Sequence, residues 1–265
     1  MSSVETAGPG PGYRDHPEHL VEFEPSPKRV RVTFAGETIV DTTNALILYE
    51  SRHVPVYYFP RADVAMDRLE ATDHSTHCPF KGDANYFSVV VDGKTADNAV
   101  WSYELPFDEV IGLKDYVALY WNRVDHWYEE DEEVFVHARS PRTRVDILDS
   151  SRSVRIELGG ETVAESRRAR LLFETGLPTR YYIPREDVGA ELLASETQTQ
   201  CPYKGYASYH SVKVGDTVHE DIVWYYPDPV HESAKIKDYL CFFNEKVDAV
   251  YIDGVAEKKP QTKWS

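Results

Sequence analysis

Hydrophobic and polar residues alternate along two short segments in separate halves of the chain. Residues 29–34 (Arg-Val-Arg-Val-Thr-Phe) and residues 153–158 (Ser-Val-Arg-Ile-Glu-Leu) place an apolar side chain at every second position. This period of two is typical of a strand with one buried face. Each segment runs through a Gly-Glu-Thr stretch into a second short run, residues 38–40 or 162–164. The pattern therefore predicts a β-hairpin in both places.

Further apolar runs extend the strand prediction. Residues 45–50, 55–59 and 86–91 are rich in aliphatic and aromatic side chains, and the last run meets a turn at Asp92-Gly93 before residues 100–103 return. Helical signals are brief: one turn starting after Pro60 and running to Leu69, and another over residues 111–116. We predict a mainly β fold, β-rich with short helices and mostly antiparallel sheets.

The two halves of the chain repeat one another. Gly-Glu-Thr at 36–38 recurs at 160–162, and Tyr-Tyr-x-Pro-Arg at 57–61 recurs at 181–185. After the loss of one residue, Cys-Pro-Phe-Lys-Gly at 78–82 matches Cys-Pro-Tyr-Lys-Gly at 201–205, and Lys-Asp-Tyr at 114–116 matches 237–239. Because the register holds through both halves, we predict two tandem copies of one small antiparallel-sheet domain.

Composition marks the segments outside the repeats. We place the two domains at residues 28–126 and 152–255. Residues 1–27 contain Gly-Pro-Gly-Pro-Gly and predict a loose N-terminal arm that is tied down near residues 20–23. Residues 127–151 contain Glu-Glu-Asp-Glu-Glu, a charge block typical of a solvated linker. Residues 256–265 are predicted to form a frayed tail.

Charge and composition exclude several classes of protein. The 265 residues are 42% hydrophobic and 12% aromatic, which is enough for a packed core. Their 29 Lys and Arg against 45 Asp and Glu give a net charge of −16, which disfavours binding to nucleic-acid phosphates. No run approaches the ~18 apolar residues of a membrane span. With three cysteines and no visible export signal, we predict a cytoplasmic protein with reduced thiols, no nucleic-acid partner and no membrane partner. We also expect the two domains to pack on each other.

The Cys-Pro-x-Lys-Gly motif carries candidate chemistry in each copy. A neighbouring ammonium favours the thiolate form of a cysteine, and Lys81 and Lys204 each follow three residues after Cys78 and Cys201. Proline fixes φ and glycine tolerates positive φ, so the motif predicts a stiff turn that holds two side chains at a fixed separation. We predict that the two cysteines are nucleophiles or redox groups activated by the lysines. The alternative is a structural turn with a buried cysteine and a surface lysine.

Charged and aromatic residues shared by the two copies complete the candidate site. Glu50 and Glu174 end apolar strands, and we predict acid, base or orienting roles for them. Arg61 and Arg185 are predicted to bind anions; alternatively each arginine forms a structural ion pair with the glutamate of its copy. An aromatic pocket lining, or simply an aromatic core, is expected from Tyr57, Tyr86, Trp101 and Tyr103, and from Tyr181, Tyr209, Trp224 and Tyr226.

Metal binding has weak support. His74 and His77 precede Cys78 with a spacing typical of metal ligands, but Gln200 replaces His77 in the second copy and no Cys-x-x-Cys occurs. We predict no cofactor and no metal shared by the copies, and leave open a metal in the first copy alone. The same asymmetry also allows His77 to act as a base for Cys78, with the second copy a degenerate partner. Cys241 lies in an apolar run and is predicted to be core.

Each copy resembles the DUF427 family, a domain of unknown function of bacteria and fungi. The resemblance rests on the Gly-Glu-Thr hairpin, Tyr-Tyr-x-Pro-Arg-x-Asp-Val, Thr-x-Cys-Pro-Phe/Tyr-Lys-Gly, and the Trp-x-Tyr and Lys-Asp-Tyr segments. It covers about residues 28–126 and 152–250, like the tandem members of the family. It implies a small β-rich fold similar to the Mss4-like or β-tent group. That group often carries zinc on cysteine pairs, which this chain lacks, so a metal is not implied here.

These observations lead to a hypothesis about function. We predict a small-molecule enzyme or ligand-processing protein that acts through the Cys-Pro-Phe/Tyr-Lys-Gly turn in an aromatic-lined pocket. The alternatives are a non-catalytic module that binds a small molecule or peptide, and a structural tandem scaffold. Fold resemblance alone does not decide between them.

Overall fold

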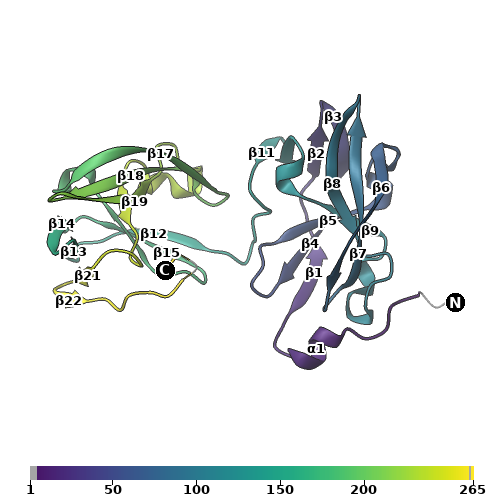
Figure 1. Ribbon diagram of the computed structural model, residues 1–265, viewed down its shortest axis with the longest axis horizontal. Helices are drawn as coiled ribbons and strands as arrows, with labels where there is room; N and C mark the ends of the chain where they lie inside the picture. The colour runs from purple at the N-terminus through teal and green to yellow at the C-terminus, as the bar shows by residue number, and fades with distance from the viewer. Residues whose placement is uncertain (1–4, 263) are drawn as a thin grey trace. The chain divides into compact units, whose positions relative to one another are not determined.

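The alternating segments form strands of two sheets in each half of the chain. The computed structural model describes residues 5–262 and 264–265, and it divides into two units between Ala138 and Arg139. Each unit has a seven-stranded and a four-stranded sheet, and the strands of each ladder run antiparallel (Figure 1). The predicted β-rich, two-domain fold is confirmed.

Unit one orders its larger sheet as β1 (Val21–Pro25), β4 (Leu46–Glu50), β5 (Val56–Pro60), β9 (Tyr116–Leu119), β8 (Lys94–Ser102), β7 (Gly82–Val91) and β6 (Leu69–Cys78). Its smaller sheet runs β11 (Glu132–Val134), β10 (His126–Glu129), β2 (Val30–Phe34) and β3 (Glu37–Thr42). The helices of this unit are short: α1 (Pro11–Asp15), η1 (Arg61–Asp63), η2 (Met66–Arg68), η3 (Asp108–Leu113) and η4 (Trp121–Arg123).

Unit two repeats this topology strand for strand. Its larger sheet runs β12 (Val145–Asp149), β15 (Arg170–Glu174), β16 (Arg180–Ile183), β20 (Leu240–Phe242), β19 (Thr217–Tyr225), β18 (Gly205–Val214) and β17 (Glu191–Cys201). Its smaller sheet runs β14 (Glu161–Ser166), β13 (Val154–Leu158), β21 (Ala249–Ile252) and β22 (Val255–Ala256), and its short helices are η5 (Arg185–Asp187) and η6 (His231–Ile236).

The larger sheet of unit one carries apolar side chains on both faces. One face packs against the smaller sheet, where the alternation of β2 buries Val30 and Val32 completely against residues such as Phe59. The other face holds a second cluster that includes Tyr58 and Tyr86, and residues of η3 help to cover it. Because adjacent residues of a strand point to opposite faces, neighbouring tyrosines enter different clusters.

The strand pattern follows the sequence closely in some places and not in others. The hairpin predicted over residues 29–40 is β2–β3, and the predicted returning hairpin at Asp92-Gly93 is β7–β8. The turn predicted between Pro60 and Leu69 is two short 3₁₀ helices, η1 and η2. The long strands β6 and β17 were not predicted, because they are mostly polar and show no apolar period.

Segments predicted as arm and linker contribute strands to both units, and β12 of unit two lies within the predicted linker. Residues 21–25 form β1, which pairs with β4, and β10 and β11 lie at the start of the predicted acidic linker. Residues 1–4 of the predicted arm lie outside the described residues. Within the part of the chain that the structure describes, none of the helices has the length and apolar character needed to span a bilayer.

The Cys-Pro-x-Lys-Gly motif forms the turn between β6 and β7. Cys78 pairs with Gly82 across the hairpin end, and the Lys81 N–H donates to the Cys78 carbonyl at 3.3 Å. Gly82 has φ +105°, and a Cβ at this position would lie 3.2 Å from the Leu105 carbonyl oxygen. Gly205 in unit two has φ +104° and the same close approach, to Asp228. The glycine is therefore required by both backbone conformation and space.

We predict that Gly82→Ala lowers the free energy of unfolding by about 1–3 kcal/mol, because alanine is strained at this φ. Urea denaturation measures the change. Gly205→Ala is expected to have a similar effect in unit two. The control is Gly189→Ala, where a Cβ meets open space and φ lies outside the left-handed region. Equal stability of Gly82→Ala and Gly189→Ala would show that the turn tolerates a side chain.

Candidate functional site

A buried ion pair fixes the turn of each unit to the end of a neighbouring strand. Lys81 Nζ donates to Glu50 Oε2 at 2.5 Å, and their side chains are 8% and 10% exposed. Glu50 is the last residue of β4, so the pair joins this strand to the β6–β7 turn. Lys204 and Glu174 repeat the contact at 2.5 Å in unit two. The lysine of the motif is thus buried and engaged by a carboxylate in both units.

The pKa of Glu50 reflects two opposing effects. Burial raises the pKa of this carboxyl, while the hydrogen bond and positive charge of Lys81 lower it, with a smaller contribution from His19. The net effect is a pKa below the ordinary 4.5. Glu50 is therefore ionised at neutral pH and holds Lys81 as a charged partner.

The motif cysteines end β6 and β17 and are free thiols with partial exposure. Cys78 packs against the cluster of unit one that contains Tyr58 and Tyr86. His77 does not share its face: its Nδ1 lies 2.6 Å from Asp83 Oδ1, in an exposed cross-strand pair. This pairing directs His77 to a carboxylate; a role as a base for Cys78 was one possibility that the sequence left open.

Aromatic side chains gather on the same face as the cysteine in each unit. We call this set the aromatic face; it consists of Tyr58, Tyr86, Trp101, Tyr103 and Tyr120 in unit one. In unit two it consists of Tyr182, Tyr209, Trp224, Tyr226 and Phe243, which contact or pair with one another, and Cys201 acts on the pKa of Tyr182 and Tyr226. In both units the tryptophan Nε1 donates to the strand tyrosine, from Trp101 to Tyr58 at 3.3 Å and from Trp224 to Tyr182 at 3.1 Å. The geometry of the face is therefore built twice.

Polar atoms are spaced along the aromatic face. The hydroxyls of Tyr86 and Thr76 share a hydrogen bond of 2.9 Å, and those of Tyr209 and Thr199 share one of 2.8 Å. Burial raises the pKa of Tyr103, and the neighbouring Tyr58, Cys78 and Glu50 raise it further.

The corresponding tyrosine of unit two behaves in the same way. Burial raises the pKa of Tyr226, with Cys201, Tyr209, Cys241 and Glu174 adding to the shift. In each unit the cysteine and the carboxylate of the ion pair thus lie close enough to a buried tyrosine to raise its pKa.

Four predicted site residues lie elsewhere. Tyr57 and Tyr181 face the core between the sheets, where the Tyr57 hydroxyl donates to Glu129 at 2.8 Å. Arg61 donates to Ser102 at 2.7 Å and to Glu104 at 3.0 Å. Arg185 lies 3.1 Å from His210 Nε2. Ser102 follows Trp101 in β8, and adjacent residues of a strand point to opposite faces of the sheet. Because Arg61 bonds to Ser102, it lies on the face opposite to the aromatic face.

The two turns are covered by different segments. In unit one the Gly12 N–H donates to the Pro79 carbonyl at 2.9 Å, and the His19 ring stacks on Phe80 with centroids 3.7 Å apart. His19 also lies 3.2 Å from Glu50. In unit two the equivalent ring is Tyr203, whose hydroxyl accepts from the Ser140 N–H at 2.7 Å. The surroundings of the turn thus differ while its backbone is the same.

Unit two also has a second buried ion pair beside its aromatic face. Arg180 donates two hydrogen bonds of 2.7 Å to Glu245, and its guanidinium lies 5.5 Å from the Trp224 ring centroid. Burial raises the pKa of Glu245, but the hydrogen bonds from Arg180 and Thr262 outweigh it, and the pKa falls from 4.5 to about 2. In sequence, Val56 and Asn122 occupy these two positions in unit one.

Sequence reasoning missed two tyrosines that lie at the candidate site. Tyr58 and Tyr182 lie beside Cys78 and Cys201 on the aromatic face, whereas the sequence-based prediction names the neighbouring Tyr57 and Tyr181. Both tyrosines of each pair are retained in the repeat, so the signal was present. A known register of β5 and β16 would have assigned each tyrosine to its face.

The described part of the chain contains no cluster of side chains that could bind a metal ion. Among residues 5–262 and 264–265, no three His, Cys, Asp or Glu side chains gather as a metal site would require. His74 packs its ring 4.4 Å from Tyr86, and His77 pairs with Asp83. Cys241 is fully buried, and burial raises its pKa to about 12.

Comparison with known proteins identifies one family. A family model described as a domain of unknown function, DUF427, matches residues 22–130 and 146–253. The two matched segments follow the two structural units and cover most of the chain. No curated protein matches the sequence. The similarity to the Mss4-like or β-tent group stays a prediction.

We predict that removing one partner of the Lys81–Glu50 pair is far more damaging than removing both. Lys81→Met leaves a buried carboxylate without its cation, and we expect a loss of about 3–5 kcal/mol in the free energy of unfolding. The double variant Lys81→Met/Glu50→Gln removes both charges and is expected to recover a large part of this loss. Urea denaturation of the wild type, Lys81→Met, Glu50→Gln and the double variant gives the coupling energy. Strictly additive effects would contradict the proposed role of the pair, and Lys204→Met/Glu174→Gln repeats the test in unit two.

We predict a pH-dependent role for Glu245. Because its pKa is lowered in the folded chain, its contribution to stability is complete above pH 4.5 and is lost as the pH falls toward about 2. The difference in free energy of unfolding between the wild type and Glu245→Gln is therefore expected to be largest at neutral pH and to close at pH 2. Denaturation series at several pH values measure it. A difference that stays constant with pH would contradict the assignment.

Proposed function

The chain belongs to the DUF427 family, whose function is unknown, and we propose that each unit binds and processes a small molecule through the turn cysteine. The observation that carries this proposal is a free, partly exposed thiol beside aromatic side chains in both units: Cys78 packs against the aromatic face, and Cys201 lies close enough to Tyr182 and Tyr226 to raise their pKa. A packing role alone does not require a thiol at this place twice. A nucleophile, in contrast, needs both access and a fixed position.

The surroundings of the thiol support a ligand of modest size. Large aromatic side chains with a few hydroxyls are typical of small-molecule sites. Trp101 and Tyr120 of this face are partly exposed, with ring centroids 4.6 Å apart. The net charge of −16 favours a small molecule over a nucleic acid as partner. A cytoplasmic location stays a prediction.

A non-catalytic binding module is the second candidate, and one contact favours it. The Lys81 ammonium bonds to Glu50 at 2.5 Å, so its charge is already neutralised by a carboxylate. In this case the lysine positions the turn and does not activate the thiol. The same argument applies to Lys204 and Glu174. The reactivity of the two cysteines distinguishes the candidates.

We predict that iodoacetamide labels Cys78 and Cys201 of the folded protein at neutral pH faster than it labels the same cysteines in short, unstructured peptides of the same sequence. Cys241 is the internal control, because it is fully buried with a pKa of about 12 and stays unlabelled in the folded protein. Mass spectrometry of the digested protein gives the rate at each cysteine. Labelling as slow as the free peptide thiol would reject covalent processing and leave the binding module.

A matched variant tests the role of the lysine. Lys81→Met/Glu50→Gln removes both charges around the turn of unit one while unit two is untouched. A lysine that activates the thiol predicts slower labelling of Cys78 with no change at Cys201. A purely positioning pair predicts the same rate at both cysteines, provided that circular dichroism shows an intact fold.

A further inference from the structure

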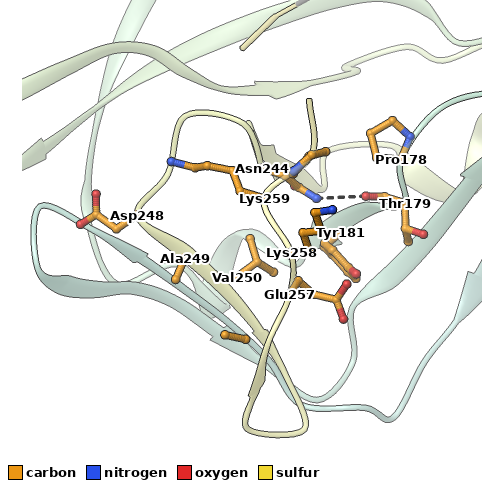
Figure 2. Close-up of a pocket in the computed structure, with 12 residues that line it drawn as sticks. Pro178, Thr179, Tyr181, Asn244, Asp248, Ala249, Val250, Glu257, Lys258 and Lys259 are labelled. Atoms are coloured by element: carbon orange, nitrogen blue, oxygen red, sulfur yellow. Dashed lines mark hydrogen bonds between the residues drawn. The ribbon is translucent and has the colours of Figure 1, made fainter. Parts of the chain in front are cut away.

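Unit two contains a pocket away from the aromatic face. It has a volume of about 280 Å³ and opens beside β16, β21 and the residues that follow β22 (Figure 2). Its size approaches the lower end of the ~300–1,000 Å³ range of small-molecule sites. The lining residues are Pro178, Thr179, Tyr181, Asn244, Asp248, Ala249, Val250, Ala256, Glu257, Lys258, Lys259 and Pro260.

The same region of unit one is occupied by two indole rings. Asn244 and Val250 correspond in the repeat to Trp121 and Trp127. The register confirms the second pair, since Trp127 lies opposite Val32 and Val250 lies opposite the equivalent Ile156. Trp121 and Trp127 stack with centroids 4.1 Å apart and an interplanar angle of 11°. Unit two has therefore exchanged a stacked aromatic pair for two smaller side chains.

Asn244 and Val250 are smaller than the tryptophans at the equivalent positions of unit one, so they leave space for a ligand. Protein interiors are close-packed, and a void with apolar walls is able to take up a matching molecule. Val250 and Ala249 form part of the wall, and Tyr181 contributes a largely buried ring with 6% exposure. The exchange thus leaves one aromatic and two aliphatic side chains on one wall, opposite charged residues that include Asp248 and Glu257, and removes the rings present at these positions in unit one.

Polar groups of the pocket have also changed relative to unit one. The Tyr57 hydroxyl donates to Glu129, but the residue equivalent to Glu129 is Ile252, so Tyr181 loses this acceptor. Burial raises the pKa of Tyr181 to about 12, and Glu257 adds to the shift. The Asn244 amide donates to the Thr179 carbonyl at 3.1 Å, as Figure 2 shows. The side chains of Tyr181 and Asn244 therefore provide a hydroxyl and an amide at the pocket that can form hydrogen bonds with a ligand.

We propose that this pocket of unit two binds a planar aromatic small molecule about the size of indole. The ring occupies the space that the Trp121 ring fills in unit one. The tyrosine hydroxyl and the asparagine amide orient it, and the exposed Lys258 and Lys259 lie at the rim. This site is separate from the aromatic face and does not depend on the turn cysteine.

Indole itself is the probe, and the full-length isotope-labelled protein is titrated and followed by amide NMR. We expect saturable shifts in the amides of residues 179–181, 244 and 249–250. Asn244→Trp restores a ring at this position and is expected to weaken indole binding by about tenfold or more. Val218→Trp adds a ring at an exposed position of β19 outside the pocket and serves as the control, with binding close to that of the wild type.

The outcomes decide the proposal. Shifts absent from these residues, or centred on residues 201–209 of the aromatic face, would overturn it. A folded Asn244→Trp protein that binds indole as tightly as the wild type would do the same. If Asn244→Trp does not fold, Val250→Trp fills the pocket from the other wall, and the same loss is expected. Thiol labelling of Cys201 is measured in parallel; it stays unchanged by indole, so failure here is distinguishable from failure of the proposed function.

Discussion

The Lys–Glu pair at the turn is the contact on which the candidate site depends. Two charges with about a tenth of their side-chain surface exposed lose most of their hydration, and each is stable there only because the other compensates it. The contact joins residues 31 positions apart in unit one, from the end of β4 to the β6–β7 turn. It therefore sets where Cys78 and the following strand lie relative to the aromatic face. Unit two uses the same contact for the same purpose.

The turn and the strand period together explain which predicted residues meet. Glycine with φ +105° lets the chain reverse close to the Leu105 carbonyl, and the strands on either side then alternate their side chains between two faces. Tyr86 and Trp101 are register partners and share the face of the cysteine. Arg61 bonds to Ser102 in the next step of the register and faces the other way. A list of reactive residue types thus becomes a site only when the register is known.

Much of the fold was accessible from the sequence, since the repeat and the apolar period specified the domain count and several hairpins. The polar strands β6 and β17 were not, because their stability comes from pairing with β7 and β18 and not from an apolar face of their own. The partner of Lys81 was also inaccessible. Cys78 is its neighbour in sequence, but the fold brings Glu50 to its ammonium. Sequence proximity suggested activation of a thiol, whereas three-dimensional contact shows a charge pair.

Differences between the units lie around the common frame and follow a consistent direction. Where unit one has Val56 and Asn122, unit two has the buried pair Arg180 and Glu245, which places a guanidinium over Trp224. Unit one has the stacked rings of Trp121 and Trp127. At the equivalent positions unit two has Asn244 and Val250, which line a pocket. A buried ion pair thus replaces a valine and an exposed asparagine at one place, and an open volume replaces a stacked aromatic pair at another.

These exchanges have different physical costs. A buried ion pair preserves packing density but is sensitive to loss of either charge, whereas a pocket gives up dispersion contacts that a bound ring restores. The Lys–Glu pair at the turn and the Trp–Tyr and Tyr–Thr hydrogen bonds of the aromatic face, in contrast, are the same in both units. A divergence that spares the turn while opening space elsewhere fits the two proposed sites, because the site shared by both units constrains the frame and the pocket proposed in unit two uses positions that the frame leaves free to vary.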